Sequence, residues 1–483
     1  MADSAAVQLQ QPHAIMISLH LQGHINPFIH LALSLASRGF TVTFAHLHFV
    51  HRQISAAGAG DPFAGARAAG FDIRYTTLSD GLPIDFDREA HHDQFLHSFR
   101  HRLPDIVAEF VGEIIQANPS SPEFFLVADT FSIWAAEVAG KLGLVNVSFW
   151  TEPAVVFSLY YHLDLLRRNG DVPVAGRWKN VDYLPGIPSI NTKDFVSYLH
   201  DSELGPIHHL LFDSFQAVRS ADFVLCNTPA ELEPAAISGL NETVPFYAIG
   251  PMVRESESCE IARSFLPESD CTEWLNSQPA GGVLYVSFGS FVKIDREVIG
   301  AVAGGLLRSG VRFLWVLRPG MVDSGDGDGG GSGLPEGFEI RVRGKGKVVT
   351  WCNQNQVLGN PATGGFLTHC GWNSILESIW HGVPMICFPV FTDQITNRKL
   401  VVEDWKVGVN LSGVNGGSLK EEEVAEKIGG LMEGEMRKGL KEEVEKVGKV
   451  LQAAAAENGS AAGNFDRFAA ELSEQLQRRR RRR

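Results

Sequence analysis

The polarity of the chain follows a repeating order of short apolar runs and longer segments whose apolar residues recur at helical spacing. Ala14–Leu19 is an apolar run, the loop His20–His24 follows it, and a helix is expected to open near Asn26-Pro27 and to end at Arg38-Gly39. Proline suits a first helical turn because its missing N–H costs nothing there. With the next apolar run at Thr41–Ala45, this order predicts a βαβ unit, whose two strands lie parallel in one sheet.

The same order continues through the first half of the chain and restarts in the second half. The further predicted strands are Phe124–Ala128 (ending at Asp129), Val145–Phe149, Val283–Phe288, Phe313–Leu317, Val348–Thr350, Gly365–Thr368 and Met385–Phe388, with a helix over Arg296–Ser309. Strands that alternate with helices favour an α/β fold with two Rossmann-like domains, each built on a parallel sheet. Such sheets bind ligands at the carboxyl ends of their strands, so we expect the site in the cleft between the domains.

Changes in composition predict where the chain divides. We expect a first domain over residues 1–250, an acidic and polar linker over 251–271, a second domain over 272–460, a closing helix over 461–477 that docks on the first domain, and a disordered arginine tail over 478–483. Ser324–Gly333 is almost entirely Gly, Ser and Asp and predicts a mobile loop. The Glu and Lys residues of Lys420–Lys449 lie at helical spacing and predict solvated helices.

Composition narrows the class of protein. The 483 residues are 44% hydrophobic and 20% charged, which excludes a mainly disordered chain, a collagen-like chain and a small disulfide scaffold. The net charge is −14 despite the basic tail, so nucleic acid is not an expected partner. No apolar stretch reaches the length of a membrane span.

The cysteines and the first residues bear on location. Six cysteines show neither a C-x-x-C motif nor a metal-binding spacing, and the first twelve residues lack the basic start and apolar core of a signal peptide. We therefore expect reduced thiols in a cytoplasmic protein, and we expect that protein to be a monomer.

One turn in the second half has the chemistry of an anion site. The predicted strand Gly364-Gly365-Phe366 leads into Thr368–Ser374, and a helix that contains Glu377 follows. A strand that enters a helix through a glycine turn aims several backbone N–H groups at one point, where the helix dipole adds roughly half a positive charge. The alternative is an ordinary tight turn whose Ser or Asn caps the helix.

A second pair of residues, in the first half, has the chemistry of a general base. His24 follows one predicted strand and Asp129 ends another, so both lie at the carboxyl edge of one sheet. A carboxylate that accepts from one imidazole nitrogen fixes the tautomer in which the other nitrogen accepts a proton. The chain has 17 histidines, so a structural or solvent-exposed His24 is the alternative.

The stretch from Trp351 to Gln394 resembles the signature of plant secondary-product glycosyltransferases, the family 1 enzymes that use UDP-sugars. The resemblance extends from Gln22-Gly23-His24 to the closing helix, and it implies the GT-B architecture of two Rossmann-like domains that face a cleft. It also implies that His24 is the catalytic base and that Asp129 holds it. Cys352-Asn353 replaces a more usual small residue and proline, and Ile375 replaces a common threonine; backbone contact to uracil survives a cysteine.

The resemblance assigns each matched position a part of a UDP-sugar. The residues that it places on the donor are Trp351 (stacking on uracil), Cys352 (backbone bond to the uracil edge), Gln354 and Glu377 (ribose), Ser290, His369, Asn373 and Ser374 (diphosphate), and Trp372, Asp393, Gln394 and Thr151 (sugar). Gln394 in the last position resembles glucose users. These roles imply an inverting transfer of glucose from UDP-glucose to a hydroxyl of a small lipophilic plant metabolite, a phenolic or terpenoid, giving a β-glucoside.

The acceptor is expected against the first domain, in an apolar pocket. Its candidate wall residues are Phe86, Phe95, Phe131, Phe149, Tyr161, Phe195 and Tyr198, with Phe391 from the other side. Each of these aromatic residues could instead belong to a core.

No metal and no cofactor are expected. Asp326 and Asp328, like Asp85 and Asp87, match the D-x-D pattern by which other glycosyltransferases bind a divalent metal, but solvation or ion pairing explains them equally well. Two other functions stay open: a catalytically silent UDP-sugar-binding protein and a Rossmann-type NADPH reductase. The reductase lacks support because no G-x-G-x-x-G follows an early strand, and a serine hydrolase because no G-x-S-x-G is present.

Overall fold

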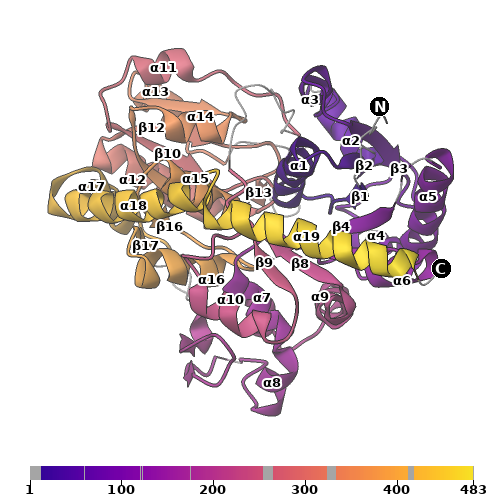
Figure 1. Cartoon of the computed structure of the whole chain (residues 1–483). Helices are drawn as coiled ribbons and strands as arrows, with labels where there is room; N and C mark the ends of the chain where they lie inside the picture. Colours follow the sequence, from indigo (N-terminus) through magenta and orange to yellow (C-terminus); the bar gives the residue numbers. More distant parts are fainter. Residues whose placement is uncertain are drawn as a thin grey trace.

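Two parallel β-sheets, each flanked by helices, form the two halves of the molecule (Figure 1). The computed structural model describes residues 12–481 apart from 59, 120, 122, 175, 254–264, 324–332 and 412–417. The first sheet has the order β3-β2-β1-β4-β5-β8-β9. Its strands are β1 (His13–Ile17), β2 (Thr41–Leu47), β3 (Ile73–Leu78), β4 (Phe124–Asp129), β5 (Val145–Trp150), β8 (Phe223–Cys226) and β9 (Phe246–Ala248).

The second sheet has the order β14-β12-β10-β15-β16-β17. Its strands are β10 (Val283–Ser287), β12 (Arg312–Val316), β14 (Gly346–Val349), β15 (Thr363–Thr368), β16 (Met385–Cys387) and β17 (Gly408–Asn410). All pairs in both sheets are parallel. β1, β5, β10 and β15 are buried along their whole length, as expected for parallel strands that helices cover on both faces. The predicted α/β class and pair of parallel sheets are confirmed.

Helices connect the strands and cover both sheets. In the first half they are α1 (Gln22–Ser37), α2 (His48–Ala56), α3 (Ala64–Ala68), α4 (His92–His101), α5 (Leu103–Ala117), α6 (Ala135–Leu142), α7 (Ala154–Tyr161), α8 (Leu163–Arg168), α9 (Pro206–Ala217) and α10 (Pro234–Asn241). In the second half they are α11 (Thr272–Asn276), α12 (Arg296–Ser309), α13 (Phe338–Arg341), α14 (Gln354–Gly359), α15 (Trp372–Trp380), α16 (Gln394–Lys399), α17 (Glu421–Met432), α18 (Gly434–Ala454) and α19 (Ser460–Arg480). Most of the predicted loop 324–333 and the middle of the predicted linker 251–271 lie outside the described residues.

The start of α1 differs from the prediction. The helix begins at Gln22, so His24 lies in its first turn, and Pro27 lies inside the helix. Proline has no N–H to donate to the carbonyl four residues earlier, which here belongs to Gly23. The side chain of Asn373 from the second half donates to that carbonyl instead, at 2.7 Å. A contact between the halves therefore satisfies the group that the proline leaves free, and such a contact cannot be inferred from local sequence.

The last helix crosses from the second half to the first (Figure 1). On α19, the Phe468 ring packs against Phe223 and Tyr247 of the first sheet, with centroids 5.4 and 5.8 Å away. Glu471 accepts a hydrogen bond of 2.6 Å from the Tyr247 hydroxyl. The closing helix therefore lies against the first sheet.

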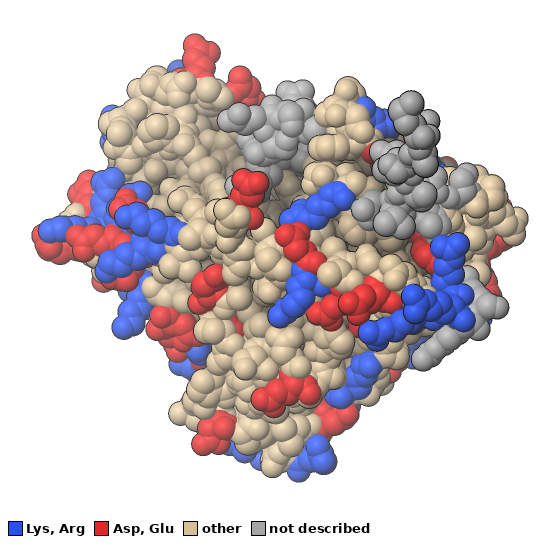
Figure 2. Space-filling model, in the orientation of Figure 1, with Lys and Arg blue, Asp and Glu red and all other residues tan. Residues whose placement is uncertain are grey.

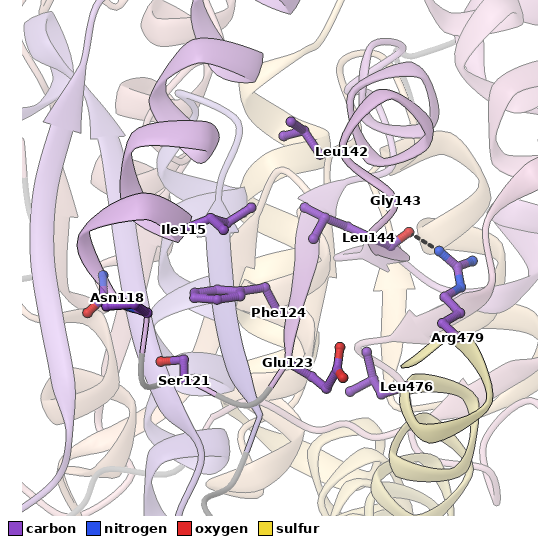
Figure 3. Close-up of a pocket in the computed structure, with 11 residues that line it drawn as sticks. Ile115, Asn118, Ser121, Glu123, Phe124, Leu142, Gly143, Leu144, Leu476 and Arg479 are labelled. Atoms are coloured by element: carbon purple, nitrogen blue, oxygen red, sulfur yellow. Dashed lines mark hydrogen bonds between the residues drawn. The ribbon is translucent and has the colours of Figure 1, made fainter. Parts of the chain in front are cut away.

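The arginine tail is helical for longer than predicted. Arg478–Arg480 continue α19, and Arg479 donates to both carboxylate oxygens of Asp222, at 2.8 and 2.9 Å. Figure 3 shows Arg479 also reaching the Leu144 carbonyl beside a small cavity of about 250 Å³. The prediction of disorder is wrong for these three residues because an acidic partner anchors the helix end; residues 482 and 483 lie outside the described part.

Charged side chains of both signs intermingle on the face shown in Figure 2, and they are dense at the edge formed by α17 and α18. Pairs such as Lys446–Glu443 and Lys441–Glu445 lie three or four residues apart on α18, in line with the predicted solvated helices. In the described part of the chain, none of the helices combines the length and the hydropathy that a bilayer span requires.

Candidate active site

The carboxyl edges of the two sheets enclose a cleft of about 1090 Å³ that residues from both halves line. Every residue that the sequence assigns to the donor lines this cleft. His24 lines it as well, whereas Asp129 lies behind the imidazole and is 2% exposed. The sequence pattern therefore predicted a set of residues that the fold does bring together.

His24 and Asp129 form a buried hydrogen-bonded pair on the first wall of the cleft. The Nδ1 of His24 lies 2.7 Å from Oδ2 of Asp129 and 3.0 Å from the hydroxyl oxygen of Thr151. The other carboxylate oxygen of Asp129 accepts from the backbone N–H of Phe131 at 2.9 Å, so the carboxylate is itself held in place. With Nδ1 engaged, Nε2 is the imidazole nitrogen left for a ligand.

A network of polar side chains on the second wall surrounds the expected ribose position. The Gln354 amide donates to the Ser374 hydroxyl oxygen at 2.9 Å and to the Glu377 carboxylate at 2.7 Å. The Tyr285 hydroxyl donates to Gln354 at 3.3 Å. Trp351 follows β14, is partly buried and lines the cleft, and an indole offers a flat surface on which a base can stack. The network thus places a flat apolar ring next to a carboxylate.

His369 follows β15, and its imidazole packs against two glycine backbones. A Cβ added at Gly289 or at Gly371 would lie 2.5 Å from Nε2 of His369, so both positions require glycine. Burial lowers the pKa of His369 to about 4, so the ring is neutral near pH 7. Gly371 is the N-cap of α15 and provides no side-chain cap, which leaves N–H groups of the first turn open to an anion.

The residues assigned to the sugar lie where the two walls meet. Asp393 accepts from Thr392 at 2.7 Å and from Asn397 at 2.5 Å, and burial raises its pKa. Gln394 accepts from the backbone N–H groups of Val390 and Phe391. These bonds fix the orientation of both side chains before any ligand binds.

Trp372 makes a hydrogen bond to the first half of the molecule that the sequence did not predict. Its indole N–H donates to the Asn227 carbonyl in the first half at 2.6 Å, so the ring N–H is not available to a sugar. The Asn227 amide in turn donates to the Asn373 side chain at 3.2 Å. Trp372 and Asn373 therefore join the two walls as well as lining the cleft.

Five of the eight aromatic residues predicted for the acceptor pocket line the cleft. They are Phe86, Phe95, Phe131, Tyr198 and Phe391. The prediction is wrong for the other three. Phe149 is fully buried and packs edge-on against Phe28 of α1, Tyr161 stacks on Phe157 within the core, and Phe195 is fully buried.

Sequence reasoning missed several further residues of the cleft, and three of them have polar side chains and come just after strands. Arg318 follows β12, donates to the Val292 carbonyl, and adds positive charge near His369. Glu152 follows β5, and His20 follows β1 with its ring 4.8 Å from that of Phe95. All three lie just after strands of the two sheets, and that position was the available signal.

Neither metal motif forms a cluster in the described part of the chain. No group of three or more His, Cys, Asp or Glu side chains there could hold a metal ion. Asp85 pairs with Arg52, and Asp87 accepts from the backbone N–H groups of Glu89 and Ala90. Asp326 and Asp328 lie outside the described residues.

The chain has clear relatives among known proteins. A family model described as UDP-glucoronosyl and UDP-glucosyl transferase matches residues 258–443. UDP-glycosyltransferase 86A1 of Arabidopsis thaliana is 46% identical over 97% of this chain and 96% of its own length. Gallate 1-beta-glucosyltransferase 84A23 of Punica granatum is 33% identical over 83% of this chain and 78% of its own length. UGT2 of Phytolacca americana, solved with UDP-2-fluoro-glucose and pterostilbene, has a TM-score of 0.78 and 27% identity over 96% of this chain and all of its own.

Two Rossmann-like domains that enclose a single cleft define the GT-B class of glycosyltransferases. The chain belongs to the plant family 1 UDP-glycosyltransferases. This membership removes the NADPH reductase from the alternatives.

Proposed function

We propose that this protein is an inverting UDP-glucosyltransferase that transfers glucose from UDP-glucose to a hydroxyl of a small lipophilic plant metabolite. The observation that carries the proposal is that His24, hydrogen-bonded to Asp129 behind it, lines the same cleft as the Gln354–Ser374–Glu377 network. The names of relatives that print a glucosyltransferase or a glucose analogue support glucose as the sugar. Gln394 at the end of the signature supports it as well.

The reaction follows from the two walls of the cleft. Nε2 of His24 takes the proton from the acceptor hydroxyl, and the resulting oxygen attacks the anomeric carbon of UDP-α-glucose. The bond between that carbon and the UDP oxygen breaks on the opposite face, so the product is a β-glucoside and UDP leaves as an anion. A base positioned in this way contributes roughly 10²–10⁴-fold to the rate.

Charge on the departing UDP is stabilised without a metal in this proposal. The uncapped N-terminus of α15, the hydroxyls of Ser290 and Ser374, and the Arg318 guanidinium supply donors and positive charge on the second wall. Fixed donors in a site that excludes water stabilise a developing anion more strongly than the same groups in water. His369, neutral near pH 7, adds a donor and no charge.

The acceptor pocket of the proposal is apolar and lies mainly in the first domain. Phe86, Phe95, Phe131 and Tyr198 line it from that side, and Phe391 lines it from the second domain. Such walls favour a flat or polycyclic phenolic or terpenoid. We place the reaction in the cytosol, in a monomer; the five described cysteines are free and buried, which agrees with a reducing compartment.

A screen tests the proposal. Purified protein is incubated with UDP-glucose and a panel of phenolic and terpenoid alcohols, and UDP release and product mass are measured. We expect at least one acceptor to gain the mass of one hexosyl group. The protein could instead bind UDP and yet release no UDP from UDP-glucose with any member of a broad panel. That result would support a silent UDP-sugar-binding protein.

A further inference from the structure

Glu152 is an acidic residue that lines the cleft on the same wall as His24 and Thr151. It is the second residue after β5, next to Thr151, and its backbone carbonyl accepts from the Cys226 thiol at 3.4 Å. Its side chain is partly buried and lines the cleft. Among the residues that the structure describes, none donates a hydrogen bond to this carboxyl group. An unpartnered carboxyl in a binding cleft is costly unless a ligand supplies the partner.

The groups around Glu152 are acidic or neutral. Asp129 on β4 and Asp393 before α16 both repel its negative charge, and burial together with this repulsion raises its pKa well above the usual range. Tyr160 on α7 and Tyr198 also line the cleft, and the charge of Glu152 contributes to the raised pKa of each, after the larger effect of burial. Within the described part of the chain, no lysine or arginine offsets these charges. The protonated form is therefore favoured, and its O–H is a hydrogen-bond donor.

The position of Glu152 points to the donor sugar. Thr151, its neighbour in the chain, is assigned to the sugar and lies 3.0 Å from Nδ1 of His24. Asp393 is also assigned to the sugar, and of the neighbouring charges it raises the pKa of Glu152 the most. Glu152 lines the same cleft as these two residues, so a hexose bound at the positions assigned to them would bring its hydroxyls near the Glu152 carboxyl group.

We propose that Glu152 is a specificity-determining residue for the donor, whose carboxyl hydrogen-bonds a hydroxyl of a neutral hexose and, with Asp393, excludes a uronic acid. This inference rests on the proposed function and deepens it, because the family description names both glucuronosyl and glucosyl transfer. A uronic acid would bring a further negative charge close to Asp129 and Asp393, where no lysine or arginine of the described residues offsets the charge of Glu152, and burying it there is strongly unfavourable. A neutral hexose instead supplies hydroxyls that accept from Glu152.

Binding measurements test this inference independently of turnover. Calorimetry is used to measure the affinities of UDP, UDP-glucose and UDP-glucuronic acid for the wild type, Glu152→Ala and Glu152→Gln. Glu137→Gln, which removes an exposed carboxylate on α6, is the matched control. We expect the wild type to bind UDP-glucose at least about 10-fold more tightly than UDP-glucuronic acid.

The two variants separate a hydrogen bond from a general effect. Glu152→Ala is expected to weaken the affinity for UDP-glucose about 5- to 10-fold and to leave the affinity for UDP unchanged. This change in affinity corresponds to the loss of one hydrogen bond. Glu152→Gln keeps a donor of the same size and is expected to stay within about 2-fold of the wild type. Equal affinities of the wild type for the two UDP-sugars, or a Glu152→Ala variant that leaves UDP-glucose unchanged or weakens UDP equally, would overturn the inference.

A kinetic readout distinguishes the donor from the acceptor. With an active acceptor, Glu152→Ala is expected to raise the KM for UDP-glucose and not the KM for the acceptor; the reverse result would place Glu152 on the acceptor and overturn the inference. As the pH rises, Glu152 loses the proton that it donates, so the donor KM of the wild type is expected to rise while that of Glu152→Gln stays flat. If no acceptor reacts at all, the proposed function fails, and the binding data still decide the role of Glu152.

Discussion

The Nδ1 of His24 lies 2.7 Å from Oδ2 of Asp129, although 105 positions separate the two residues in the chain. β1 and β4 are adjacent in the first sheet and parallel, so the chain segments that follow them leave the sheet at the same edge. The pair is buried, with side-chain exposures of 10% and 1%, which shields it from competing water. The bond engages Nδ1 and leaves Nε2 as the nitrogen that can accept a proton.

We expect Asp129→Ala to lower kcat about 10²–10⁴-fold, because the imidazole loses the group that fixes its tautomer and orientation. UDP affinity is expected to stay within about 2-fold, since Asp129 does not line the cleft. Steady-state kinetics together with calorimetry of UDP check both statements. A kcat within a few-fold of the wild type would show that Asp129 does not act through His24.

Trp351→Ala is expected to weaken UDP about 10-fold or more, because stacking of a base on an aromatic ring contributes about 1–3 kcal/mol. Trp178, which is 54% exposed and away from the cleft, offers a matched control. Calorimetric titration with UDP compares Trp351→Ala with Trp178→Ala. Unchanged UDP affinity in Trp351→Ala would show that the uracil does not stack on Trp351.

Gly371→Ala is expected to abolish UDP binding or weaken it more than about 10-fold. The new Cβ would lie 2.5 Å from Nε2 of His369, at the helix start to which we assign the diphosphate. Gly300→Ala is the control, since its Cβ on α12 meets nothing within 4 Å. That change is expected to stabilise the protein by about 0.5–1 kcal/mol, measured by denaturant unfolding. A Gly371→Ala variant with wild-type UDP affinity would contradict the packing described for His369.

The sequence predicted the frame of the molecule well because its strands are buried apolar runs, which parallel sheets require. Trp351, Gln354 and Glu377 were placed correctly in one site because a single local segment carries them. The aromatic residues of the acceptor pocket were predicted less well. Whether Phe149 or Tyr161 points into the cleft or into the core depends on the residues that pack around it in the folded protein. The start of α1 was missed for the same reason, because Asn373 satisfies the carbonyl that Pro27 leaves free.

We expect several buried histidines to make the stability of the protein depend on pH in the acid range. Burial lowers the pKa of His20 and His46 to about 3 and that of His13 and His369 to about 4. Below about pH 6.5 the unfolded chain takes up protons on these residues before the folded chain does, so stability falls as the pH falls.

Each of these histidines is expected to lower the free energy of unfolding by up to about 1.4 kcal/mol per unit fall in pH between about pH 6 and 4. His46 lies outside the cleft, and His46→Gln is expected to flatten the dependence of the melting temperature on pH in this window. Thermal unfolding of the wild type and the variant from pH 8 to 4 checks this. Parallel curves for the two proteins would show that His46 is not buried in its neutral form.

The central claim is that His24 supplies the base on one wall of the cleft while the other wall holds the nucleotide. The most direct measurement is the turnover of UDP-glucose and the affinity for UDP in a single preparation of His24→Ala. We expect turnover to be lost and UDP to bind within about 2-fold of the wild type. Turnover at the wild-type rate, or loss of UDP binding together with turnover in a folded protein, would contradict the account.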